Sequence, residues 1–91
     1  MTTTLSPESK PRVGPGFRLQ WEEAQQAHVL LYPEGMIKLN QSAGEILKRC
    51  DGREVRDVVA DLQRAFDTSG LEPEVLAFLD IAVRQRWVEL A

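Results

Sequence analysis

The stretch LLYPEGMIKLNQSAGEILKRCDG, which runs from Leu30 to Gly52, carries the strongest fold signals in this 91-residue chain. Its first half is typical of two short strands, because apolar residues lie on both sides of a Pro-Glu-Gly turn at residues 33–35. Its second half is typical of an amphipathic helix, because apolar residues recur every three to four positions from Ala43 to Cys50. The stretch therefore predicts a hairpin that leads directly into a helix.

The residues before this stretch complete a small sheet. Phe17, Leu19 and Trp21 alternate with polar residues, which is the pattern of a half-buried strand. His28–Tyr32 forms the next predicted strand and Met36–Leu39 the third. Together they predict a three-stranded antiparallel meander. A sheet this small needs other elements packed on one face.

Three predicted helices supply those elements. The first begins after Asn40, whose side chain can cap it, and ends before Gly52. The second runs from about Glu54 to Phe66, with Phe66 as the last residue of its buried stripe. The third has Pro73 in its first turn and continues to about Arg86. The predicted fold class is therefore α+β and winged-helix-like, with a three-stranded antiparallel β-meander followed by three α-helices.

The first sixteen residues, MTTTLSPESKPRVGPG, predict a flexible N-terminal tail. They hold three of the five prolines and two of the six glycines, with few large aliphatic side chains. Such a segment buries too little apolar surface to offset the entropy lost on ordering. We expect residues 1–16 to lie outside the fold and residues 17–91 to form one domain.

The composition argues against several classes of function. The 11 basic and 14 acidic residues give a formal net charge of -3, which is the wrong sign for a nucleic-acid binder or an anionic membrane surface. His28 and Cys50 are the only histidine and cysteine, too few for a zinc site or a disulfide. No apolar run approaches the roughly 20 residues of a membrane span. We expect a cytoplasmic protein that is not an enzyme and holds no cofactor or metal.

The third predicted helix has a wide apolar arc. Its apolar side chains point in two directions about 100° apart. One direction holds Val75, Phe78, Leu79 and Ala82, and the other holds Leu76, Val83 and Trp87. Such an arc fits either a helix buried in a corner of the core or a helix that keeps one apolar flank for a partner.

The second possibility predicts a peptide-binding site. If Met36–Leu39 is an edge strand beside the third helix, its unpaired backbone groups can accept a peptide as an added strand. Leu76, Leu79 and Val83 would then form an apolar wall for alternate side chains of that peptide.

Two other uses of the fold stay open. One is a DNA-binding winged-helix regulator, which the acidic start of the third helix, at Glu72 and Glu74, disfavours. The other is self-association, in which two copies pair through the exposed strand edge to form a homodimer.

The Leu30–Gly52 stretch also resembles the signature of the PqqD family of pyrroloquinoline quinone (PQQ) biosynthesis. The shared features are the Pro-Glu-Gly turn, the Leu39-Asn40 pair, a helix start rich in small residues and a final Cys-Asp-Gly. The likeness extends from about Phe17 to Leu90. It implies a RiPP recognition element, a peptide chaperone that binds the precursor peptide PqqA by strand addition and presents it to the radical SAM enzyme PqqE.

The resemblance also implies where the peptide lies, against the third strand in a cleft closed by the third helix. The implied peptide-binding residues are Met36, Ile37, Lys38, Leu39, Val75, Leu76, Leu79 and Val83. No catalytic, metal-binding or cofactor-binding residue is implied, because the radical chemistry belongs to the partner enzyme. The chain departs from the family pattern at Arg86, where a glycine is frequent, and at Ala82, where a larger aliphatic residue is common.

Overall fold

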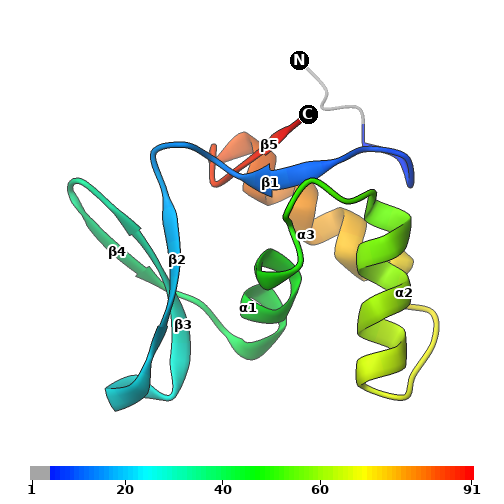
Figure 1. Ribbon diagram of the computed structural model, residues 1–91, viewed down its shortest axis with the longest axis horizontal. Helices are drawn as coiled ribbons and strands as arrows, with labels where there is room; N and C mark the ends of the chain where they lie inside the picture. Colours follow the sequence, from blue (N-terminus) through cyan, green and yellow to red (C-terminus); the bar gives the residue numbers. More distant parts are fainter. Residues whose placement is uncertain (1–4) are drawn as a thin grey trace.

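A three-stranded antiparallel sheet stands beside three helices, and a separate two-stranded sheet joins the two ends of the chain (Figure 1). The structure is a computed structural model that describes residues 5–91. The elements in chain order are β1 (Pro11–Val13), β2 (Arg18–Glu22), the 3₁₀ turn η1 (Glu23–Gln25), β3 (Ala27–Tyr32), β4 (Gly35–Lys38), α1 (Gln41–Lys48), α2 (Val55–Ala65), α3 (Glu72–Arg84) and β5 (Val88–Leu90). The predicted α+β class, with a meander followed by three helices, is confirmed.

The larger sheet has the strand order β2-β3-β4 and packs on the helices through one face. Leu30 of β3 lies opposite Leu19 of β2 and Ile37 of β4, and all three contact the hydrophobic core. The rows on the other face are Leu31 with Arg18 and Met36, and the fully buried Val29 with Gln20 and Lys38. Figure 1 shows all three helices on one side of this sheet. The buried row therefore anchors the sheet to the helices, as side-chain alternation requires.

The helix α1 packs against β3 at a glycine. A β-carbon on Gly44 would lie 2.8 Å from Nδ1 and 3.1 Å from Cβ of His28, so only a glycine allows this approach. The predicted cap of α1 is confirmed, because the Asn40 side chain accepts a hydrogen bond of 2.7 Å from the backbone N–H of Ala43.

Buried side chains from α1, α2 and α3 form one core with the sheet. Its members on the helices include Ile46, Leu47, Val55, Val58, Val59, Leu62, Val75, Leu79 and Ala82. The prediction that Phe66 completes the buried stripe of α2 is wrong, since Phe66 follows the last turn of the helix and is 47% exposed.

The expectation that the N-terminal segment lies outside the fold is wrong for residues 5–16, and residues 1–4 lie outside the described residues. Pro11 is buried, and β1 pairs with β5 in an antiparallel register that sets Arg12 opposite Glu89. An ion pair of 2.6 Å joins these two side chains. The pairing of β1 with β5 therefore joins the N-terminal segment to the C-terminal strand.

The same segment also completes the start of α2. The side chain of Glu54, at the N-cap position, makes no capping hydrogen bond. Instead, the backbone N–H groups of Val55 and Arg56 donate to the carbonyls of Ser9 and Pro7, at 2.8 and 2.9 Å. The first N–H groups of any helix have no partner inside it, so these carbonyls satisfy donors that would otherwise need water or a side chain.

The end of α3 also differs from the prediction. The helix ends at Arg84 instead of continuing to about Arg86, and the chain then turns into β5, which the sequence did not indicate. Arg86 makes this turn in the left-handed conformation, with φ of 66°. A residue with a side chain is strained there, whereas glycine is not.

We expect Arg86→Gly to raise the free energy of unfolding by about 0.5–1 kcal/mol, because glycine removes the left-handed strain but gains entropy in the unfolded chain. Urea denaturation measures the change. Gln85→Gly is the matched control, since Gln85 has a φ of -82° and glycine at this position should destabilise the protein. Equal destabilisation by both substitutions would contradict this account.

Removal of residues 1–16 should lower the free energy of unfolding by about 3 kcal/mol or more, because β1, the partners of α2 and the buried Pro11 are lost together. A chain that starts at Leu5 is the control, since it keeps every described contact. The comparison is made by urea denaturation, and equal midpoints for the two truncated chains would show that the N-terminal segment is dispensable.

Candidate functional site

The strand β4 is a free edge of the larger sheet. β3 is its only neighbour among the described strands. The N–H of Leu39 donates to the carbonyl of His28 at 3.0 Å. Because bonded residues alternate along an antiparallel pair, Ile37 also bonds to β3, whereas the backbone groups of Met36 and Lys38 point away from the sheet. These N–H and C=O groups are available to another strand.

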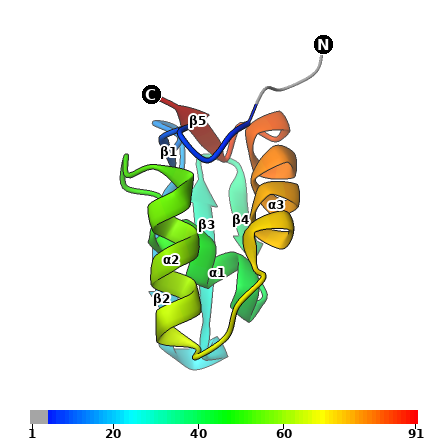
Figure 2. The same ribbon diagram turned by 90° about the vertical axis from the view of Figure 1, so that its right-hand side faces the viewer.

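The helix α3 lies on the side of the molecule to which this edge faces. Figure 2 shows β4 and α3 on one side and β2, the other edge of the sheet, on the side of α2. The side chains of Leu76 and Val83 on α3 pack against the core but keep part of their surface exposed. An added strand next to β4 would therefore have an apolar helix flank nearby.

The eight predicted peptide-binding residues fall into two groups. Five have accessible side chains: Met36 and Lys38 are exposed, and Ile37, Leu76 and Val83 are partly buried. The other three, Leu39, Val75 and Leu79, have at most 5% of their surface exposed and belong to the core. The accessible five remain the predicted peptide contacts, and the buried three support them from within the core.

Val83 also lines a shallow hollow at the end of α3. This hollow, of about 650 Å³, lies between the linker of residues 14–17 and the turn into β5. A β-carbon on Gly14 would lie 2.7 Å from the carbonyl oxygen of Arg86, and the N–H of Gly14 donates to the carbonyl of Trp87 at 2.8 Å. The sequence-based prediction put Gly14 in the flexible tail and did not include this contact.

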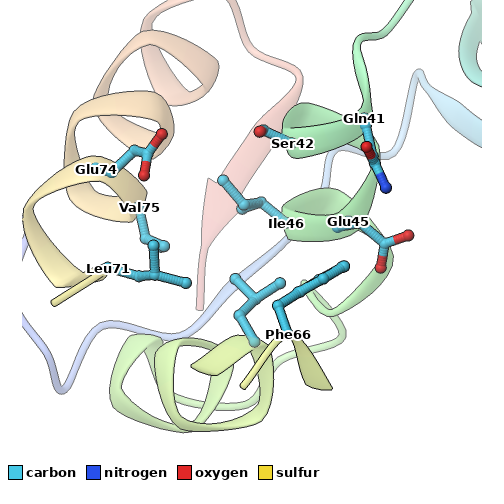
Figure 3. Close-up of a pocket in the computed structure, with 9 residues that line it drawn as sticks. Gln41, Ser42, Glu45, Ile46, Phe66, Leu71, Glu74 and Val75 are labelled. Atoms are coloured by element: carbon cyan, nitrogen blue, oxygen red, sulfur yellow. The ribbon is translucent and has the colours of Figure 1, made fainter. Parts of the chain in front are cut away.

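A second hollow, which the sequence did not indicate, lies between the three helices. We call it the three-helix hollow: about 210 Å³ in volume, with Ile46 of α1, Leu62 of α2 and Val75 of α3 among its lining residues (Figure 3). Val75 therefore contributes to the wall of this hollow. Phe66 lies at its edge, and its place just before the Asp-Thr-Ser-Gly turn was the signal that it could be exposed.

The two residues with reactive side chains have structural surroundings. Cys50 is buried, its thiol donates to the carbonyl of Ile46 at 3.2 Å, and burial raises the pKa of the thiol to about 12. The thiolate is therefore not available near neutral pH. His28 packs edge-on against Trp21, with ring centroids 5.0 Å apart.

Neither metal sites nor membrane spans are found in the part of the chain that the structure describes. No three His, Cys, Asp or Glu side chains of residues 5–91 are grouped so that they could hold a metal ion. No helix within those residues is long and apolar enough to cross a bilayer.

The fold and the site define a class of protein: a small, winged-helix-like α+β domain that offers an open strand edge beside a partly exposed apolar helix. The sequence model of a family described as Coenzyme PQQ synthesis protein D (PqqD) matches residues 27–88. The PqqA binding protein of Pseudomonas aeruginosa strain PAO1 is 54% identical over 85 residues, which cover 91% of this chain and 92% of that protein. The chain belongs to the PqqD family, as the resemblance predicted.

Two further comparisons agree with this assignment. The PqqA binding protein of Methylococcus capsulatus is 45% identical over 86 residues, which cover 93% of this chain and 92% of that protein. The solution NMR structure of the PqqD truncation of Methylobacterium extorquens PqqCD, described as a functional and stand-alone RiPP recognition element, matches with a TM-score of 0.79. It is 32% identical and the match covers 96% of both chains.

Proposed function

We propose that this chain binds the precursor peptide PqqA as an added strand along β4 and presents it to the radical SAM enzyme PqqE in PQQ biosynthesis, without catalysing a reaction itself. The observation that carries the proposal is the free edge of β4 on the side of α3. Relatives that align with most of this chain are named PqqA binding protein, and the matching solved structure is described as a RiPP recognition element.

The proposed guest strand has a defined relation to β4. Its backbone groups pair with the N–H and C=O groups of Met36 and Lys38. A guest residue opposite Ile37 points to the same face as Ile37, which is the face that packs on the core. That residue meets the flank of α3 that carries Leu76 and Val83. The backbone pairing supplies affinity, and the apolar flank supplies the choice among guest sequences.

Of the other predicted partners and uses, PqqE is part of the proposal, whereas a homodimer through β4 and DNA binding are not. Presentation to PqqE requires a complex of three components, whereas a homodimer through β4 would occupy the edge that PqqA needs. DNA binding is disfavoured because Glu72 and Glu74 are exposed at the start of α3, and their negative charges would repel phosphate groups. The cytoplasmic location stays a prediction.

Val83→Asp should weaken PqqA binding at least about tenfold and keep the fold. Val83 is partly exposed on the flank that faces the proposed guest, so the bound peptide would bury the new carboxylate, which is costly. Ile81→Asp is the matched control, since Ile81 is on the same helix, is 52% exposed and points about 160° away from Val83. Calorimetric titration with PqqA, together with a circular dichroism spectrum of each variant, measures both properties. Leu79→Asp should also weaken binding, but it is a less specific test because it places the charge in the core.

Two results would contradict the proposal. One is the absence of PqqA binding at tens of micromolar, about the range expected for a modest edge-strand interaction, with or without PqqE. The other is unfolding of the Val83→Asp variant, which would show that this flank belongs to the core and that the peptide site lies elsewhere.

A further inference from the structure

The three-helix hollow is a second concave surface, separate from the edge of β4. Its floor is apolar, with Ile46, Leu62 and Val75 contributed by three different helices. Figure 3 shows Leu71 and Val75 on one side, Ile46 on the other and Phe66 below them. Because each wall belongs to a different helix of the core, the hollow is part of the rigid body of the fold.

The volume of the hollow limits what it can hold. At about 210 Å³ it is smaller than the roughly 300–1,000 Å³ of sites for cofactors and drug-sized ligands. A cavity of about 150 Å³ lined by aliphatic and aromatic side chains accepts benzene. The three-helix hollow therefore fits one aromatic or large aliphatic side chain.

Phe66 is the exposed apolar surface that such a side chain would cover. It is 47% exposed, and Trp21, Met36 and Ile81 are the other large apolar side chains of residues 5–91 with comparable exposure. Of these four, Phe66 is the one that borders the hollow between the helices. An exposed aromatic ring beside an apolar pocket is typical of the anchor region of a protein interface.

The rim of the hollow is acidic. Its lining residues include Glu45 and Glu74 but no lysine or arginine. A hydrogen bond of 2.7 Å from Arg49 holds the pKa of Glu45 below its ordinary value, and Arg49 also pairs with Asp61 at 2.5 Å, so its charge is shared by two carboxylates. Glu74 is exposed, and none of the ion pairs within residues 5–91 includes it.

We propose that the three-helix hollow is a docking site for a partner protein, which inserts one aromatic or large aliphatic side chain that is flanked by lysine or arginine. The apolar floor takes the anchor side chain, and Glu74 attracts the neighbouring cation. The site does not overlap the edge of β4, because no residue of β4 lines the hollow and Figure 1 shows α1 between the sheet and α2. A partner can therefore dock while the strand edge is occupied.

Capped dipeptides test the proposal directly. N-acetyl-Trp-Arg-amide, N-acetyl-Trp-Glu-amide and N-acetyl-Ala-Arg-amide are titrated into the isotopically labelled full chain, and NMR follows the methyl signals of Ile46, Leu71 and Val75. We expect saturable shifts of these signals with the Trp-Arg probe, a Kd at least about fivefold higher for the Trp-Glu probe, and no saturation with the Ala-Arg probe.

Charge-reversal variants test the role of the rim. Glu74→Lys should raise the Kd of the Trp-Arg probe at least about threefold, whereas Glu72→Lys, in the same turn of α3 but outside the hollow, should change it less than about twofold. PqqA affinity should be the same for both variants, so that failure of the hollow and failure of the β4 site give different results.

Several outcomes would overturn the proposal. They are the absence of saturable shifts, shifts confined to residues outside the hollow, and equal affinity for the Trp-Arg and Trp-Glu probes. Sedimentation that shows self-association of the unmodified chain, abolished by Glu74→Lys, would assign the hollow to a second copy of this chain and would also overturn it.

Discussion

The close packing of α1 on β3 at Gly44 sets the position of the sheet relative to the helices. A sheet of three strands needs its apolar face covered, and this contact, together with the burial of Leu30, joins the sheet to the core. A side chain at Gly44 would displace the side chain of His28. Because this packing sets which edge of the sheet lies on the side of α3, the proposed peptide site depends on a contact that includes none of the proposed peptide-binding residues.

Local patterns in the sequence were sufficient for most of the fold. The Pro-Glu-Gly turn, the alternation before it and the Asn40 cap predicted the meander and the start of α1, because these signals arise from neighbouring residues. The edge position of β4 was also predictable, because the third strand of a three-stranded meander lies at an edge of the sheet. The family was also predictable, since the Leu30–Gly52 motif is specific.

Other features depend on contacts between distant residues and were not predictable. Arg12 and Glu89 are 77 positions apart, and three-residue strands show no periodicity, so the pairing of β1 with β5 left no local signal. The wide apolar arc of α3 indicated two directions but not which was covered. The structure buries Leu79 in the core and leaves part of the Val83 side chain exposed.

The central claim is that PqqA extends the sheet at β4, and hydrogen exchange of single backbone amides measures this directly. With PqqA at saturation, the amides of Met36 and Lys38 should exchange at least about tenfold more slowly, while those of Leu19 and Trp21, on the opposite edge, should not change. Unchanged exchange at Met36 and Lys38, or protection on β2 instead, would contradict the account.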